Sequence, residues 1–164
     1  MKFDVIVIGG GSAGLEAALA GCADGRRVAL IAKGRSLEDI DYNPFISAGG
    51  TLMMGDCVTE GFIEQGNVTG IRTENLGPTL LTADKYILAT GKFFGGGLVA
   101  DMSGIREPLF ALDVQYTADG WFDADFFAPQ PFMSFGVKTD AEGHPYKDGK
   151  PVANLVAVGD ICAG

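Results

Sequence analysis

The sequence lacks the residues that several classes of protein need. Its 164 residues include three cysteines and one histidine. Cys22, Cys57 and Cys162 are scattered and have no CxxC spacing, which argues against a zinc site and against a dithiol reductase. The same pattern favours reduced thiols in a cytosol, so we expect a cytoplasmic protein.

Long apolar runs and basic surface are also missing. No run approaches the roughly 20 apolar residues that a membrane span needs. The first residues lack the layout of a signal peptide, because acidic Asp4 precedes a short apolar run. Asp and Glu outnumber Lys and Arg, 21 to 12, and the net charge of −9 excludes a nucleic-acid surface.

Glycine, by contrast, is abundant. The chain has 25 glycines, and 47% of its residues are apolar, which predicts a folded single domain over residues 1–164 with a real core. The glycines cluster at 9–14, 49–70, 91–97 and near the end. Such clusters between apolar runs indicate backbone that lies close to a ligand.

The first 33 residues predict a βαβ unit. A β-branched run at 3–8 predicts a buried parallel strand. An Ala- and Leu-rich helix follows over Ser12–Ala23, and a second strand is expected at 27–32.

After this unit the alternation of strands and helices breaks. Residues 33–50 predict a connector with at most one helical turn, beginning at Ser36. Four short strands are then expected at 51–60, 61–65, 67–73 and 79–82, which together predict a β-meander in place of a third parallel strand. Further strands are expected at 85–89, 132–139 and 154–158, and residues 100–130 predict mixed loop. We therefore divide the domain into residues 1–33, a connector over 34–48, and residues 49–164.

The pattern Gly9-x-Gly11-x-x-Gly14 lies directly between a strand and a helix. In that context Gly9 permits a tight turn, Gly11 lets the backbone approach a pyrophosphate, and Gly14 lets the helix pack on the strand. The helix begins at Ser12 and Ala13, and its N–H groups would face the phosphates. These five residues are predicted to bind a dinucleotide.

The second strand lacks the acid that usually binds the adenosine ribose. Ala32 stands at its end, followed by Lys33. Lys33, Ser36 or a neighbouring backbone group could substitute for the acid. Lys33 or Arg35 could also favour an extra phosphate, although solvated surface charges are the simpler interpretation. Because Ala32 removes the ribose anchor, FMN stays open as an alternative to FAD.

Two later motifs indicate a flavin. The stretch ADKYILATG ends in Ala89-Thr90-Gly91 and is similar to the strand end of flavoproteins with two dinucleotide-binding domains. The stretch NLVAVGD ends in Gly159-Asp160. Asp160 resembles the aspartate that accepts hydrogen bonds from a flavin's ribityl hydroxyls, a role that suits an acceptor-only carboxylate.

We also place Val58 among the predicted cofactor contacts. Because the glycine fingerprint, the Ala-Thr-Gly strand end and the Gly-Asp strand end occur in this order along the chain, the predicted cofactor is FAD-like.

A second fingerprint, Gly95-x-Gly97-x-x-Ala100, does not predict a second nucleotide-binding unit. It does not directly follow a strand, and Ser103-Gly104 and Pro108 prevent a full crossover helix after it. We interpret it as a flavin-side loop. A stand-alone nicotinamide-dependent flavin reductase is therefore disfavoured.

Three stretches of the sequence resemble one enzyme family in detail. The chain resembles the B subunit of anaerobic glycerol-3-phosphate dehydrogenase in ATGKFFGGGLVADMSGIREPLFALDV, DFFAPQPFMSFGVKTD and NLVAVGD. The resemblance covers residues 1 to about 33 and about 49 to 164. It implies an α/β fold with an FAD/NAD(P)-binding, Rossmann-like three-layer core, and oxidation of sn-glycerol 3-phosphate to dihydroxyacetone phosphate with electrons passed to a quinone pool. It also implies a partner flavoprotein subunit and a membrane-associated iron–sulfur subunit at the inner face of the membrane.

The chain departs from this family in two places. Members carry a large segment where residues 33–48 stand here, and a helix after the Gly-Asp motif. We therefore expect a flavin-binding core with an internal deletion, a C-terminal truncation and no cap over the substrate. A non-catalytic FAD-binding or subunit-docking module is the alternative function, and exposed apolar surface predicts a dimer or larger oligomer.

No catalytic acid or base can be assigned from the sequence. His144 lies in a polar turn and favours a surface position. Arg106 could bind a substrate phosphate, but pairing with Glu107 or another acid explains it as well. Lys92 could stabilise a reduced flavin, although exposure is the simpler account. The aromatic residues are interpreted as core rather than ring-stacking groups: Phe93, Phe94, Trp121, Phe126 and Phe127.

Overall fold

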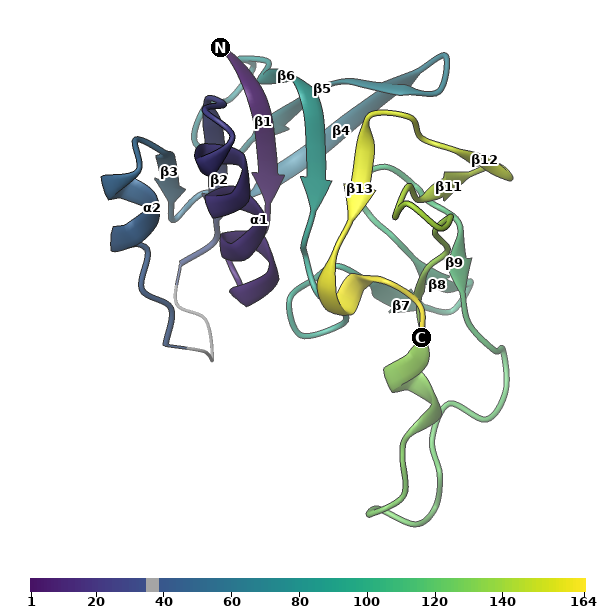
Figure 1. Ribbon diagram of the computed structural model, residues 1–164. Coiled ribbons are helices and arrows are strands. Elements are labelled where there is room, and N and C mark those ends of the chain that lie inside the picture. The colour runs from purple at the N-terminus through teal and green to yellow at the C-terminus, as the bar shows by residue number, and fades with distance from the viewer. Residues whose placement is uncertain (35–38) are drawn as a thin grey trace.

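A five-stranded parallel sheet forms the centre of the computed structural model, which describes residues 1–34 and 39–164. The strand order is β13-β6-β1-β2-β3, and every neighbouring pair is parallel (Figure 1). The strands are β1 (Lys2–Ile8), β2 (Val28–Ala32), β3 (Thr51–Met54), β6 (Thr82–Leu88) and β13 (Leu155–Ala157). The predicted α/β class is confirmed.

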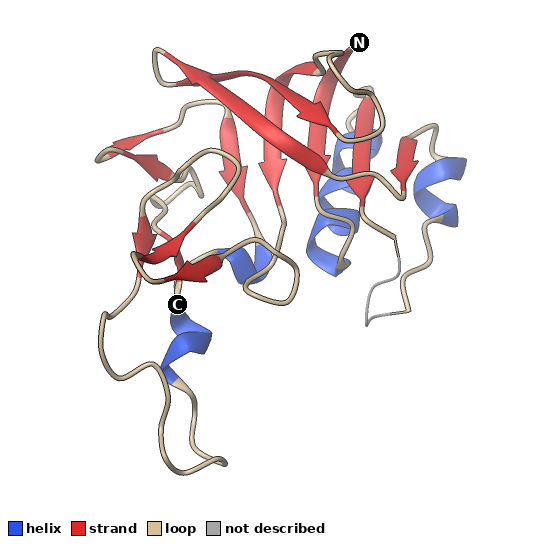
Figure 2. Ribbon diagram, turned by 180° about the vertical axis from the view of Figure 1, so that it is seen from behind, coloured by secondary structure: helices blue, strands red, loops and turns tan. Residues whose placement is uncertain are grey.

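Two other layers cover this sheet. Helices α1 (Ser12–Ala23) and α2 (Asn43–Ser47) lie on one face, and the hairpin of β4 (Val58–Glu64) and β5 (Asn67–Thr73) crosses the other (Figures 1 and 2). The alternation of side chains along β1 explains both contacts. Val5 and Val7 belong to the core cluster on the helix side, and Ile6 and Ile8 belong to the cluster on the hairpin side. The predicted three-layer core is thus observed.

The third parallel strand corrects the sequence prediction. Residues 51–54 do not open a meander: β3 pairs in parallel with β2, and α2 forms a short crossover between them. Pro44 falls in the first turn of α2, where the missing N–H and fixed φ of proline favour a helix rather than break it. Gly55, at φ 72°, then turns the chain toward the hairpin. The helical turn predicted from Ser36 begins outside the described residues.

The predicted meander is reduced to one hairpin. The expected boundary between 51–60 and 61–65 is wrong, because β4 runs without a break from Val58 to Glu64. Of the fourth expected strand, Leu81 forms only an isolated bridge with Ile71, and Thr82 already belongs to β6.

Short elements complete the chain. Strands β7 (Val99–Asp101) and β8 (Gly104–Arg106) form a hairpin within the segment predicted as loop. Strand β9 (Val114–Gln115) pairs with β10 (Gly136–Val137), and β11 (Tyr146–Lys147) with β12 (Lys150–Pro151). Two 3₁₀ helices are η1 (Pro131–Ser134) and η2 (Gly159–Ile161). The strand predicted at 132–139 is shorter than expected, because η1 occupies its first residues.

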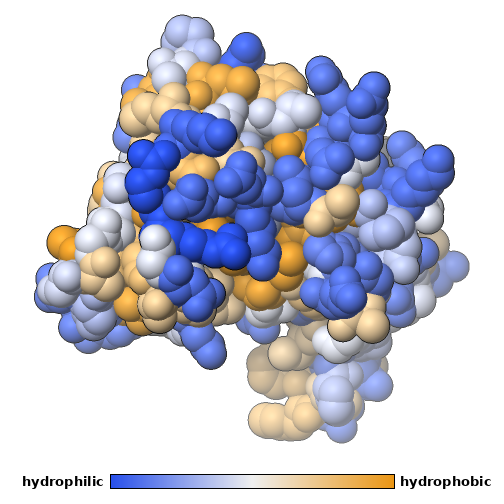
Figure 3. All heavy atoms as spheres, turned by 45° about the horizontal axis from the view of Figure 1, so that its top comes forward, coloured by the Kyte–Doolittle hydropathy of each residue, from blue (hydrophilic) through white to orange (hydrophobic). Residues whose placement is uncertain are grey.

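The two ends of the molecule differ. Hydrophilic residues gather on the face that carries the amino ends of the strands, with apolar residues between them (Figure 3). At the opposite end, residues 116–134 leave the body as a long excursion that we call the aromatic arm (Figure 1). None of the described helices is long and apolar enough to cross a membrane.

Candidate functional site

The carboxyl ends of the parallel strands bring the predicted motifs together. Ile8 lies beside Ile31 on β2 and Leu88 on β6, and Leu88 lies beside Ala157 on β13. Main-chain hydrogen bonds continue this register past the strand ends: the N–H of Gly9 donates to Ile31 (3.0 Å) and that of Ala89 to Ile8 (2.8 Å). The fingerprint loop, the end of β2, residues 89–91 and Gly159-Asp160 therefore share one edge of the sheet, where nucleotides bind in open α/β folds.

The three fingerprint glycines occupy three different environments. Gly9 has φ +112°, and a Cβ there would lie 2.1 Å from the carbonyl oxygen of Ala89. A Cβ on Gly14 would lie 1.9 Å from the carbonyl oxygen of Gly9. A Cβ on Gly11, in contrast, would meet no atom within 4 Å. Gly9 and Gly14 are thus required by packing, whereas Gly11 borders open space, as its predicted contact with a pyrophosphate requires.

The N-terminus of α1 is suited to an anion. Gly11 is its N-cap, no side chain caps it, and no acid lies in its first turn. The dipole and N–H groups of a helix N-terminus attract phosphate. Ser12 and Ala13 form this first turn, and a Cβ on Gly159 would lie 2.7 Å from the Cβ of Ala13. This close contact holds η2, and with it the exposed carboxylate of Asp160, beside the helix.

Thr90 supplies an independent sign that a ligand fits here. Its Oγ1 is buried and has no hydrogen-bond partner among the described residues. Buried hydroxyls are normally paired, so an orphaned one beside the strand ends fits a polar ligand at this edge. The fit of the residues to a flavin rests on this atom, the open space at Gly11 and the uncapped helix.

The flavin-side loop folds onto the Thr90-Gly91 turn. A Cβ on Gly97 would lie 1.8 Å from the carbonyl oxygen of Gly91, and one on Gly95 would lie 2.5 Å from that of Thr90. Gly95 and Gly97 are therefore required by contacts within the protein. In the described chain after Gly97 the next elements are strands β7 and β8 and not a crossover helix, in agreement with the prediction that this is not a second nucleotide-binding unit.

Lys33 and Val58 differ in what they offer a cofactor. Lys33 is exposed, as its simpler interpretation expects, but its ammonium also donates to the carbonyl of Gly95 (3.3 Å). It thereby links the end of β2 to the flavin-side loop. The side chain of Val58 is buried in the core, so only its backbone is left for a cofactor. Arg35 and Ser36 lie outside the described residues.

Lys92 is not the exposed cation that the simpler account predicts. Its Nζ is partly buried and donates to the carbonyls of Phe135 (2.6 Å) and Cys162 (3.2 Å). Burial lowers the pKa of Lys92, and the carboxylate of Asp160 opposes that shift. Lys92 therefore ties the loop after β6 to Phe135, which lies between η1 and β10, and to Cys162, which follows η2.

Arg106 pairs with an acid, as one interpretation expects, but Glu107 is not its partner. Its Nε lies 3.4 Å from Asp101 Oδ2 in an exposed ion pair across the β7–β8 hairpin. Glu107 is buried and accepts the N–H groups of Leu109 and Phe110, both at 2.8 Å. Burial raises the pKa of Glu107. Arg106 is accordingly a surface cation.

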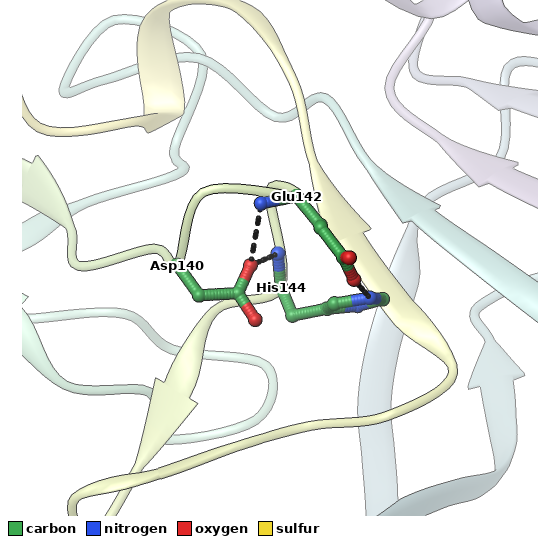
Figure 4. Close-up of side chains that lie close together, drawn as sticks. All are labelled: Asp140, Glu142 and His144. Carbon is green, nitrogen blue, oxygen red and sulfur yellow. Dashed lines mark hydrogen bonds and ion pairs between the residues drawn. The ribbon is translucent and has the colours of Figure 1, made fainter.

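His144 is held in the turn between β10 and β11 (Figure 4). Its Nδ1 lies 2.9 Å from the carbonyl oxygen of Leu155, and its Nε2 lies 3.5 Å from Glu142. Asp140 accepts the N–H groups of both Glu142 and His144. The three side chains bring potential metal-binding atoms within 4.8 Å of one another. Because the hydrogen bonds of this turn account for Asp140 and for the ring, we assign His144 a structural role.

The prediction that the aromatic residues form core is wrong for three of them. Phe94, Phe126 and Phe127 are 99%, 86% and 93% exposed, because each lies in a turn outside the sheet and the helices. Phe93 and Trp121 do pack together, with ring centroids 6.4 Å apart.

Tyr42 is a site residue that the sequence analysis did not identify. Its hydroxyl donates to the carbonyl of Gly10 within the fingerprint loop. The connector that carries Tyr42 shows no motif, so only the three-dimensional contact reveals its position.

Comparisons with known proteins agree with this geometry. A family described as FAD binding domain matches residues 4–61 and 46–164. The chain is 42% identical over 135 residues to the B subunit of anaerobic glycerol-3-phosphate dehydrogenase from Vibrio cholerae, covering 80% of this chain and 31% of that protein. It is 38% identical over 123 residues to the Yersinia pestis protein of the same name, covering 73% of this chain and 29% of that protein. The chain thus spans about a third of the length of these relatives.

A solved structure shares the fold. Thermovibrio ammonificans THI4 aligns with a TM-score of 0.55 at 14% identity, over 98% of this chain and 78% of that one. The predicted resemblance and the predicted cofactor FAD are both confirmed by these findings. The contacts that individual residues make with the cofactor stay predictions. The chain belongs to the family of FAD-binding domains.

Proposed function

We propose that this chain is the FAD-binding part of a quinone-linked glycerol-3-phosphate dehydrogenase. The observation that carries the proposal is the convergence of three motifs and the end of β2 on one sheet edge, in a chain similar to the B subunit of the anaerobic enzyme. The reaction would convert sn-glycerol 3-phosphate to dihydroxyacetone phosphate.

Different residues of the sheet edge would bind different parts of the cofactor. Gly11 and the first turn of α1 would hold the pyrophosphate, and Asp160 would accept hydrogen bonds from the ribityl chain. Ala89, Thr90 and Gly91 would lie along the flavin half. Bound FAD supplies a ring that accepts a hydride from a substrate carbon.

Lys92 would act at the flavin end as a fixed cation. Its two carbonyl contacts hold the loop after β6 against the segment that contains Asp160. The ammonium would keep positive charge near the ring, which favours a reduced, negatively charged flavin. Arg106 would serve as a substrate-phosphate contact only after leaving Asp101.

Partner subunits are the second part of the proposal. The relatives are named as one subunit of an enzyme, and the aromatic arm exposes Phe122, Phe126 and Phe127 in one segment. Exposed aromatic clusters are typical of protein interfaces. We place a partner flavoprotein or the iron–sulfur subunit against this arm, which would locate the chain in the cytoplasm at the membrane's inner face.

A non-catalytic FAD-binding or docking module is the alternative function. Two observations favour it, because both candidate functional side chains already have partners within the protein. Arg106 is paired with Asp101 at the surface, and His144 contacts Glu142 within its own turn. In this alternative the chain would bind FAD and a partner but supply no base.

Reduction of bound FAD under anaerobic conditions tests the proposal. The FAD-loaded chain is mixed with sn-glycerol 3-phosphate, and flavin absorbance is followed. Bleaching that needs glycerol 3-phosphate and is not reproduced by glycerol supports the dehydrogenase. Retained FAD that glycerol 3-phosphate does not bleach, with or without the partner subunits, favours the docking module. Rapid bleaching by NADH would contradict both.

A further inference from the structure

We propose that Tyr42 binds the adenosine ribose of FAD in place of the acid that the second strand lacks. The inference rests on FAD binding, which the proposed function also requires, but not on the reaction. It assigns a specificity role to a residue of the connector.

The last residue of β2 has no side-chain acceptor for a ribose hydroxyl, and the ammonium of Lys33 after it donates to the carbonyl of Gly95. Ala32 is 1% exposed and carries only a methyl group. In dinucleotide-binding folds a carboxylate near this point accepts hydrogen bonds from the ribose hydroxyls. The missing acceptor must come from elsewhere if the adenosine half is to be held.

The hydroxyl of Tyr42 lies at that point. A Cβ built on Gly10 would lie 2.4 Å from the Cβ of Ala32 and 2.8 Å from the Tyr42 hydroxyl oxygen. Tyr42 also donates its proton to the carbonyl of Gly10. The phenol therefore stands where the fingerprint loop and the end of β2 meet.

The order of the strands identifies which half of FAD would lie there. Asp160 follows β13 and Thr90 follows β6, on one side of β1. Ala32 ends β2, on the other side of β1. With the pyrophosphate over Gly11 and the flavin toward β6 and β13, the adenosine half extends over β2 and reaches Tyr42.

The chemistry of a phenol suits this role. A tyrosine hydroxyl can accept as well as donate, so its oxygen can take a proton from a ribose hydroxyl while its own proton bonds Gly10. Its position is fixed, because the carbonyl of Tyr42 accepts the N–H groups of Phe45 and Ile46, both at 3.1 Å. Phe45 is fully buried and anchors this turn to the core.

Flavin titrations of the whole chain test the inference, using FAD and FMN separately as ligands. FMN lacks the adenosine half. In Tyr42→Phe we expect the Kd for FAD to rise about threefold to tenfold, the loss of one hydrogen bond, with the Kd for FMN unchanged. Tyr116→Phe removes a hydroxyl from the arm and serves as the matched control, with both constants unchanged.

The ratio of the two dissociation constants decides the outcome. Equal weakening of FAD and FMN would overturn the inference, since it would assign Tyr42 to the shape of the fingerprint loop alone. Unchanged or tighter FAD binding in Tyr42→Phe would also overturn it. A chain that binds FAD but is not reduced by glycerol 3-phosphate would contradict the proposed dehydrogenase and leave this inference standing. A chain that binds neither flavin would overturn both.

Discussion

The carboxyl edge of the sheet and the aromatic arm lie at the same end of the molecule but are built in opposite ways. At the edge, backbone segments from distant parts of the chain touch so closely that Gly9 and Gly14 have no room for a side chain. On the arm, Phe126 and Phe127 touch mainly each other, with ring centroids 5.6 Å apart, and face solvent. The edge is therefore closely packed within this chain, whereas the arm leaves apolar surface uncovered.

The hydrogen bonds of the two regions show the same difference. The edge is fixed by main-chain bonds between neighbouring strands and the loops that follow them. The tip of the arm is held by local bonds, such as Asp125 N–H to Asp123 and Phe127 N–H to Asp125. A region held only locally opens at low cost in free energy, which suits a segment that orders on binding.

The largest effect on stability and FAD binding is expected from a substitution that disrupts the packing of the carboxyl edge. Gly14→Ala would place a Cβ 1.9 Å from the carbonyl oxygen of Gly9. We expect a loss of about 1–3 kcal/mol in unfolding free energy, measured by urea denaturation, and loss of FAD binding. Gly11→Ala is the matched control: it should fold normally, because that Cβ meets open space, and still bind FAD more weakly. Equal stability of the two variants would show that the close packing is not required.

A smaller effect, on flavin binding, is expected from a substitution that removes one charge from the edge. Asp160→Ala should weaken FAD and FMN alike, by about tenfold or more, because both flavins carry the ribityl chain and a charged hydrogen bond is lost. Asp119→Ala removes the same charge from the arm and should change neither constant. Flavin fluorescence titration measures both. Selective loss of FAD alone would place Asp160 at the adenosine half and contradict the arrangement.

The stability of the fold is expected to depend on pH through Glu107. This residue lies between the two regions and caps the loop that leads toward the arm. Burial raises its pKa above the ordinary 4.5, despite three N–H donors and the charge of Lys147. The folded chain then keeps this proton over a pH range in which the unfolded chain has lost it. Stability from this group is therefore present below pH 4.5 and is lost as pH rises through the folded-state pKa.

Urea unfolding of the wild type and Glu107→Gln over this range measures the effect. The wild type should lose stability relative to the variant as pH rises from about 4.5. A difference that stays constant with pH, or that changes in the opposite direction, would refute the assignment.

The smallest effect on stability is expected at the arm. Replacing Phe126 and Phe127 together by Ser should change the unfolding free energy by about 0.5 kcal/mol or less, because both rings are exposed. Light scattering should nevertheless show less self-association than in the wild type, which we expect to be a dimer or larger. A wild-type monomer at the same concentration would count against homo-oligomerisation.

The sequence predicted the edge well because its motifs are local. Continuous apolar runs mark β1, β2 and β6, and the glycine spacing requires a particular turn, so neighbouring residues alone specify them. The sequence predicted one strand over 51–60 and missed that β3 is a separate, parallel strand, because its four residues run almost directly into β4. The position of Pro44 in a helix depends on how the connector packs. The exposure of Phe126 and the contact of Tyr42 with Gly10 were missed because both depend on distant segments.

Flavin retention tests the central claim, that three separate motifs and the end of β2 form one FAD site in this chain. The purified chain is incubated with FAD, desalted, and read for flavin absorbance and protein. The account predicts one FAD retained per chain in the wild type and little in Gly14→Ala. A folded wild-type chain that loses all its FAD on desalting, and shows no saturable binding by titration, would contradict the claim.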